Sequence, residues 1–183
     1  LHSFPTRRSS DLGNSVPDMS AAALPAPRLE RLNERWLPAV LAAEQASHPH
    51  PWGPGHFRSG QAAGNCICCL IAGEALLGYF VAMPGVEEAH LLNLTVTPAY
   101  RRQGWAAALL QALALWAHSQ NAACVWLEVR AGNARARHVY ERHGFRPVAV
   151  RRDYYPADPA AAGACGARED AIVMKLDLTP ARA

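Results

Sequence analysis

The sequence predicts one α/β (α+β) domain with a mixed, mostly antiparallel central sheet flanked by helices. Three observations predict it. Half of the 183 residues are hydrophobic, which is enough for one domain with its own core. Apolar runs of strand length recur along the chain. In the second half of the chain these runs alternate with longer stretches that have the apolar spacing of helices.

The first element is expected to be helical. Apolar side chains recur at three- and four-residue spacing over 29–46, which predicts an amphipathic helix, interrupted near Pro38. The next segment, 47–57, is rich in turn-forming residues. A second, short helix is expected over 54–60.

Three strands are expected next. The runs "CICCLIA" and "ALLGYFVAM" are separated only by Gly73 and Glu74, so they predict an antiparallel hairpin. The run "AHLLNLTVT", 89–97, predicts a third strand.

The second half of the chain alternates between helices and strands. A helix of about four turns is expected over 104–119, because its leucines fall on one side. A strand is expected over 123–129, and a short helix over 133–144. Asn133 is suited to cap the start of that helix, and Gly144 is suited to end it.

The last two strands are expected in "FRPVAVRRDYY" and "EDAIVMKLDL", joined by a Pro/Ala/Gly loop over 156–168. The domain is therefore predicted to cover 28–178, followed by a tail, 179–183. Residues 1–27 are expected to be a disordered or non-native leader, with the natural chain beginning at Met19.

Composition excludes several functions. The net charge of +3 is too small to predict direct binding to nucleic acid, and no apolar stretch is long enough for a membrane helix. The five cysteines are odd in number and lack paired spacing, so we expect buried, reduced thiols, no metal and a cytoplasmic protein. A thiol- or metal-based function of the "CICC" cluster is an alternative. Neither composition nor motif predicts an oligomeric state.

The stretch "VTPAYRRQGWAAALL", 96–110, predicts an anion site. A strand feeds a helix here through a turn that contains Arg101, Arg102 and Gly104. The first N–H groups of a helix lack helical partners and lie at the positive end of its dipole, so they bind phosphate. Gly104 lets the backbone approach the anion closely, and an ordinary helix start with solvated arginines is the alternative.

Two motifs carry a resemblance to a known family. The turn "RRQGWA", 101–106, resembles the acetyl-CoA signature of the GNAT N-acetyltransferases, and "NARARHVYERHGF" resembles their second signature. Ala106 stands where many members have glycine. With "LNLTVTPAYRRQG", "RRDYYP" and "REDAIVM", the chain resembles most closely the RimI-type ribosomal-protein-alanine N-acetyltransferases, over about residues 28–178.

The resemblance implies a splayed parallel strand pair that holds acetyl-CoA as co-substrate, with no metal. The pyrophosphate would lie on the backbone N–H groups of 102–107, and a backbone N–H near Val96 would stabilise the oxyanion. The residues implied to contact acetyl-CoA are Leu94, Thr95, Val96, Arg102, Gln103, Gly104, Trp105, Ala106, Ala107 and Asn133.

Acyl transfer to an amine needs a base and an acid. Glu128 lies between Leu127 and Val129 at a strand end, and partly apolar surroundings raise the proton affinity of a carboxylate. The resemblance gives Glu128 the role of base. A tyrosine is protonated at neutral pH, and the resemblance makes Tyr140 the acid. Without the family context, a surface acid and a core aromatic residue are the simpler interpretations.

The resemblance implies an acetyl transfer to the N-terminal alanine of a small-subunit ribosomal protein, with that N-terminal peptide as partner. The loop "HPHPW" lies where the family has a substrate-side aromatic loop, so Trp52 is expected to border the peptide or, alternatively, to pack within the loop. The loop 156–168 is longer than the turn usual in the family. Other protein N-termini, lysine, a small amine, and acetyl-CoA binding without catalysis are therefore the alternatives.

Overall fold

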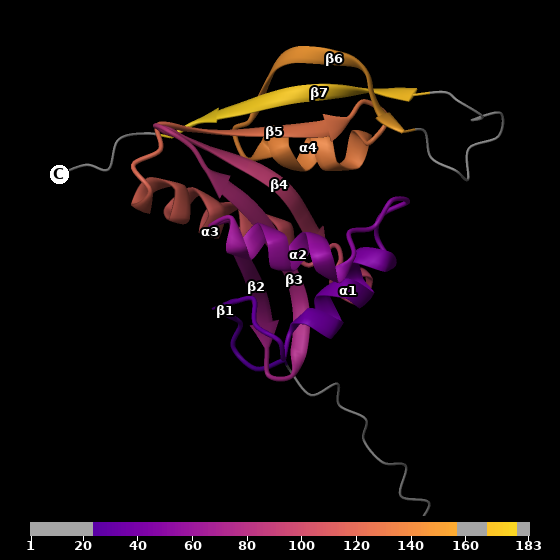
Figure 1. Cartoon of the computed structure of the whole chain (residues 1–183), viewed down its shortest axis with the longest axis vertical. Helices are drawn as coiled ribbons and strands as arrows, with labels where there is room; N and C mark the ends of the chain where they lie inside the picture. Colours follow the sequence, from indigo (N-terminus) through magenta and orange to yellow (C-terminus); the bar gives the residue numbers. More distant parts are fainter. Residues whose placement is uncertain (1–23, 157–167, 179–183) are drawn as a thin grey trace, which may run out of the picture.

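The structure is a computed structural model that describes residues 24–156 and 168–178. Seven strands form one sheet in the order β1-β2-β3-β4-β5-β7-β6. All neighbouring strands are antiparallel except β4 and β5, which are parallel (Figure 1). The elements are β1 (Arg28–Arg31), α1 (Leu37–Gln45), α2 (Pro54–Ala62), β2 (Cys66–Ala72), β3 (Ala75–Pro84), β4 (Glu88–Val96), η1 (Pro98–Tyr100), α3 (Trp105–Ser119), β5 (Cys124–Arg130), α4 (Ala134–Arg142), β6 (Arg146–Pro156) and β7 (Arg168–Asp177).

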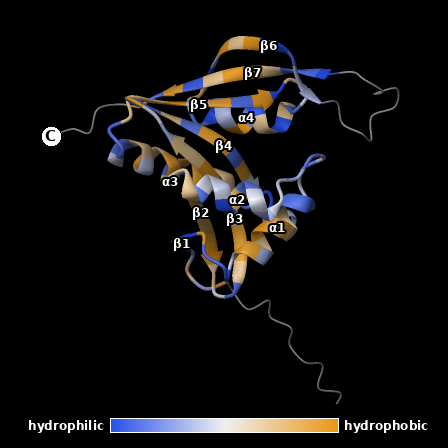
Figure 2. Ribbon diagram, in the orientation of Figure 1, coloured by the Kyte–Doolittle hydropathy of each residue, from blue (hydrophilic) through white to orange (hydrophobic). Residues whose placement is uncertain are grey.

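Helices cover both faces of the sheet, and each face has its own core. β2 and β3 are apolar along most of their length because both of their faces are covered (Figure 2). On one face, Ile67 and Tyr79 pack with Val40 of α1 and Phe57 of α2. On the other face, strand residues pack against α3 and against Phe145, which follows α4. The predicted mixed, mostly antiparallel sheet flanked by helices is confirmed.

The parallel pair separates along its length. β4 and β5 pair from Glu88 with Cys124 to Leu91 with Leu127, and the pairing ends there. The register of β3 against β4 shifts at the same level, between Val81 and Ala82. A bulge of this kind bends a strand, so the second half of β4 leaves β5 and keeps its pairing with β3. Figure 1 shows the two strands diverging.

The prediction of one helix over 29–46 is wrong. Residues Arg28–Arg31 form β1 at the edge of the sheet, paired with β2, and the helix begins only at Leu37. Leu29, at which the predicted helix begins, is about half exposed in β1. Pro38 lies in the first turn of α1, where the missing N–H of proline costs no helical hydrogen bond. It therefore starts the helix and does not interrupt it.

The other predicted elements within the described residues are found, with ends within one or two residues of those expected. The predicted cap is present, since the Asn133 side chain accepts a hydrogen bond from the Ala136 N–H. Gly144 has a φ of 95°, which fits its expected role at the helix end. The leader up to residue 23, the loop over 157–167 and the tail, 179–183, lie outside the described residues. Within the described part of the chain, no helix is both long and apolar enough to span a membrane.

Candidate active site

A cavity of about 650 Å³ lies where β4 and β5 separate. Its wall comes from four parts of the chain that are distant in the sequence: the segment after α1, the end of β4, the turn before α3 with the start of that helix, and one face of α4. It is lined by Ser47, His48, Leu94, Thr95, Val96, Arg101, Arg102, Gly104, Trp105, Ala106, Ala107, Asn133, Arg135, Ala136, Val139, Tyr140, Arg142 and His143.

The first turn of α3 supplies backbone donors to this cavity. Gly104 is the N-cap of α3 and has a φ of 87°, a left-handed conformation that side chains disfavour. The helix begins at Trp105, so the N–H groups of its first turn, at the positive end of the helix dipole, lie at the cavity wall. A Cβ on Gly104 would have no neighbour within 4 Å, so the space there belongs to the cavity. The predicted anion-binding turn therefore has suitable geometry.

The cavity carries positive charge. The guanidinium groups of Arg102, Arg135 and Arg142 come from the turn before α3 and from α4. Burial lowers the pKa of His143, so the arginines supply most of that charge at neutral pH. The start of α3 and these three arginines line the cavity, and their positive charge is complementary to the negatively charged phosphates of CoA.

The end of β4 directs a backbone donor toward the open side of the sheet. The Thr97 N–H donates to the Leu77 carbonyl oxygen of β3. Successive N–H groups of a strand point to opposite edges, so the Val96 N–H points to the side that β5 has left. The Arg101 guanidinium holds the same strand end, because its Nε donates to the Val96 oxygen at 3.2 Å and its Nη2 donates to Ser47 at 2.8 Å. Arg101 thus links the segment after α1 to the end of β4 through hydrogen bonds, and its guanidinium is not freely solvated.

Tyr140 lines the cavity from α4. Its ring packs edge-on against Phe145, with 5.8 Å between the ring centroids. Burial, with a smaller contribution from Tyr155, raises the pKa of Tyr140 to about 12. The hydroxyl therefore keeps its proton at neutral pH, as an acid must.

Glu128 is not in apolar surroundings, contrary to expectation. Its neighbours Leu127 and Val129 are buried in the core beside α3, so the Glu128 side chain points to the opposite face of β5. There its carboxylate forms a 2.8 Å ion pair with Arg151 of β6. A hydrogen bond to the same carboxylate raises the pKa of Tyr154, which therefore donates to it.

Trp52 packs within its loop, which was the alternative interpretation. Its ring stacks on His56 at 6.0 Å and meets Phe57 edge-on at 5.7 Å. Its backbone N–H donates to Glu44 at 3.0 Å. Within the described part of the chain, the cavity lining contains neither Trp52 nor Glu128 nor Gln103.

The structure brings the remaining predicted site residues together in the cavity lining, from Leu94–Val96, the α3 turn, Asn133 and Tyr140. Sequence reasoning missed the rest of α4 and the end of α1. Arg135, Val139 and Arg142 are spaced four and three apart, so a helical-face analysis of α4 could have found them. Ser47 and His48 lie in a turn-rich segment and have no periodic signal.

The cysteines of β2 belong to the core. Cys66 and Cys69 are buried, and burial raises the pKa of these thiols to about 11 and about 12. Burial likewise raises the pKa of Cys68. Thiols of this kind are poor nucleophiles. Over residues 24–156 and 168–178, no group of three histidines, cysteines or acids is arranged to hold a metal.

A splayed parallel strand pair, a helix start in the gap and a partly buried tyrosine opposite define an acyl-CoA transferase of the GNAT type. The model of the acetyltransferase (GNAT) family matches residues 29–145, and the chain belongs to that family. It is similar to the [ribosomal protein bS18]-alanine N-acetyltransferase of Escherichia coli K12, with 36% identity over 143 residues, 78% of this chain and 92% of that protein.

Solved structures agree. The crystal structure of the ribosomal-protein-S18-alanine N-acetyltransferase from Escherichia coli superposes with a TM-score of 0.74 at 34% identity, over 86% of this chain and 97% of that one. The Arabidopsis thaliana NAA60 structure in complex with acetyl-CoA has a TM-score of 0.70 at 18% identity, over 83% and 99% of the two chains, and is similar in fold. The chain is accordingly an N-acetyltransferase.

Proposed function

We propose that this enzyme transfers the acetyl group of acetyl-CoA to the α-amine of an N-terminal alanine on a small-subunit ribosomal protein. The observation that carries the proposal is the cavity between β4 and β5, which joins a helix start and arginines suited to CoA with the partly buried Tyr140. The 36% identity to the Escherichia coli enzyme supports this acceptor. Such a reaction belongs in the cytoplasm, where ribosomal proteins are made.

The proposed mechanism is direct attack of the amine on the thioester. The Val96 N–H stabilises the oxygen that becomes negative, and the Tyr140 hydroxyl gives its proton to the departing sulfur. Glu128 takes the proton of the attacking ammonium. Because Glu128 lies outside the cavity lining and is bound to Arg151, it acts through a water molecule.

Acetyl-CoA enters from the side of α3 and α4, and the peptide enters from the opposite face of the sheet. Leu127 and Val129 face the first side, whereas Glu128 faces the second, with α1 and α2. The peptide therefore passes the segment that contains Trp52. In this proposal Trp52, which is half-buried, borders the peptide with the exposed part of its side chain.

The test is mass spectrometry of acceptor peptides incubated with enzyme and acetyl-CoA. Three peptides with the same internal lysine, differing only at the N-terminus, are compared: one with a free N-terminal alanine, one with that alanine blocked, and one that begins with another residue. We expect acetylation of the first at its α-amine. Acetylation of the blocked peptide at lysine, or of small amines only, would overturn the proposed acceptor and favour the alternatives of the same fold.

A further inference from the structure

A buried carboxylate that the mechanism above does not use lies beside the cavity. Glu44 on α1 is 1% exposed, on a helix face whose other buried residues are apolar. Its oxygens accept hydrogen bonds from the Trp52 N–H at 3.0 Å, from Asn93 Nδ2 at 3.1 Å and 3.2 Å, and from the Tyr79 hydroxyl. Burying a carboxylate is costly unless donors surround it. The donors here come from three different elements.

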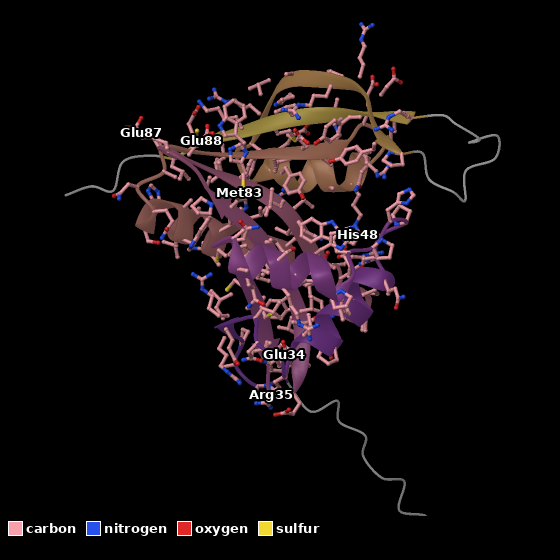
Figure 3. The ribbon with its side chains drawn as sticks, in the orientation of Figure 1. Glu34, Arg35, His48, Met83, Glu87 and Glu88 are labelled. Atoms are coloured by element: carbon pink, nitrogen blue, oxygen red, sulfur yellow. The ribbon has the colours of Figure 1, made fainter. Side chains whose placement is uncertain are left out.

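His48 connects this carboxylate to the cavity. Its Nε2 lies 3.3 Å from Glu44 Oε2 and 2.7 Å from Thr95 Oγ1. Both His48 and Thr95 line the cavity, and Thr95 belongs to the strand expected to contact the acetyl group. Figure 3 shows His48 in the loop that follows α1, on the side of that loop nearer to β5.

The hydrogen bonds determine which nitrogen of His48 carries the proton. The Thr95 hydroxyl donates to Asn93 Oδ1 at 3.0 Å, so its oxygen is left to accept from His48. The Glu44 carboxylate also accepts. Both partners of Nε2 are thus acceptors, so Nε2 bears the hydrogen and the lone pair of the neutral ring lies on Nδ1.

The charges around His48 favour the neutral ring at pH 7. Burial lowers the pKa of His48 most, Glu44 raises it, and Arg101 and Arg130 lower it. The pKa of His48 is therefore below its usual 6.5. Tyr79, also beside Glu44, has a strongly raised pKa because of burial and stays a neutral donor. When His48 takes a proton, the Glu44 carboxylate is in place to stabilise the imidazolium.

We propose that His48 is a second proton acceptor of the acetyl site and that Glu44 is its positioning residue. After Glu128 has taken the ammonium proton and the amine has attacked the thioester, the nitrogen still carries one proton more than an amide does. That N–H bond breaks, an Nδ1–H bond forms on His48, and the electron pair stays on the nitrogen as the thiolate leaves. Solvent later removes the proton from Nδ1. The inference rests on the proposed function, because it needs the acceptor amine at this end of the cavity. It differs from the role of Glu128, since His48 is part of the lining itself.

The test is His48→Gln, whose amide nitrogen replaces Nε2 as donor to Thr95 and Glu44 but has no lone pair to accept a proton. The matched control is His90→Gln. His90 lies on β4 at the other end, its side chain is 35% exposed as that of His48 is, and its Nε2 lies 2.9 Å from a glutamate, Glu88. The binding constant for acetyl-CoA is measured by calorimetry, and kcat/KM for the alanine peptide is measured from pH 5 to 9.5.

At pH 7 we expect kcat/KM to fall about 10²-fold in His48→Gln, with acetyl-CoA affinity within twofold of wild type and His90→Gln unchanged. The acid limb of kcat/KM that reports protonation of His48, below pH 6.5 in the wild type, should be absent from His48→Gln. In Glu44→Gln, which removes the charge that raises the pKa of His48, the limb should move to lower pH. If Glu44→Gln does not fold, the comparison of His48→Gln with His90→Gln still tests the role of His48.

A His48→Gln enzyme within threefold of wild type, with the same acid limb, would overturn the role of His48. A wild-type enzyme that acetylates only a different amine would overturn the proposed acceptor alone, and the comparison is then made with that amine. Absence of turnover by the wild type with every amine would overturn the proposed function and this inference together.

Discussion

The Glu128 carboxylate and the Arg151 guanidinium form a 2.8 Å ion pair between β5 and β6. The pair lies at the face of the sheet where the acceptor peptide is proposed to enter. The carboxylate is a quarter exposed, and Arg151 is more than half exposed, so solvent screens the pair. Glu128 can therefore exchange Arg151 for a water or an ammonium without a large loss of free energy.

The first prediction concerns Glu128→Gln, which keeps the shape of the side chain and removes its basicity. An α-amine has a pKa of roughly 8, so most acceptor peptide is protonated at pH 7. We expect the rate to fall strongly at pH 7 and to recover in part toward pH 9, where solvent supplies free amine. Acetyl-CoA affinity should hardly change. The measurement is a pH–rate profile of both proteins with the alanine peptide.

Arg151→Gln is the matched control, because it removes the same ion pair and leaves the carboxylate. It should retain most activity at pH 7. If Arg151→Gln loses as much as Glu128→Gln, the ion pair and not the base is what matters. Two parallel profiles for wild type and Glu128→Gln would likewise remove Glu128 from the mechanism.

The second prediction concerns Tyr140→Phe, which keeps the ring against Phe145 and removes only the hydroxyl. General acid catalysis contributes roughly 10²–10⁴-fold, so we expect a loss of kcat of that order with unchanged acetyl-CoA affinity. Because burial raises the pKa of Tyr140 to about 12, the acid form persists, and activity should not decline up to pH 10 through loss of this proton. Steady-state kinetics over that range provide the measurement.

Tyr100→Phe is the control for the loss of a tyrosine hydroxyl. Tyr100 is partly buried against the same core, but it is not among the residues that line the cavity. It should leave kcat near the wild-type value. A Tyr140→Phe enzyme within a few-fold of wild type would make Tyr140 a packing residue.

The sequence was most informative where local chemistry determines local structure. The helix start after Gly104 and the capped α4 follow from short-range rules, and both appear as predicted. It failed where tertiary pairing overrode periodicity. Leu32 and Leu37 are buried as a helical stripe requires, yet a strand precedes the first and a helix begins at the second. The backbone N–H and C=O groups at the edge of β2 pair with β1, and this tertiary pairing leaves no trace in the spacing of apolar residues along β1.

The same division applies to the site. The residues of the α3 turn could be predicted because their function depends on neighbours in the chain. The Glu44 network could not be predicted, since Asn93 lies 49 residues away and Tyr79 lies 35 residues away. The face to which Glu128 points also depended on the pairing of β5 with its neighbours. The period-two pattern of β5 indicates alternating faces and does not say which face meets the substrate.

The third prediction uses the backbone conformation of Gly104. A valine there must adopt a φ near 87° or shift the turn, and its side chain would project into the cavity. Acetyl-CoA raises the melting temperature of a protein that binds it in the native state. We expect Gly104→Val to lose most of this rise, as measured by thermal unfolding with and without acetyl-CoA.

Gly64→Val separates backbone strain from the site. Gly64 has the same φ, 87°, and the same open surroundings, but it is not among the residues that line the cavity. Both variants should lose stability without ligand, about 1–3 kcal/mol for the strained conformation. Only Gly64→Val should keep the full rise with acetyl-CoA. If acetyl-CoA raised the melting temperature of both variants equally, the assignment of the pyrophosphate to the α3 turn would be wrong.

The last prediction concerns the close approach of β3 to the end of β4. A Cβ on Gly78 would lie 2.5 Å from the Thr95 carbonyl oxygen and 3.1 Å from Val96 Cα, and neither backbone atom can move without moving the strand. Gly78→Ala should therefore lower the free energy of unfolding by about 1–3 kcal/mol, as overpacking does. It should also weaken acetyl-CoA binding, because the displaced strand carries the Val96 N–H.

Gly55→Ala in α2 is the control. A Cβ there meets nothing within 4 Å, so this variant should instead raise the free energy of unfolding by about 0.5–1 kcal/mol. Urea unfolding and calorimetry measure both effects. A Gly78→Ala protein with wild-type stability and affinity would show that β4 holds its position without the glycine.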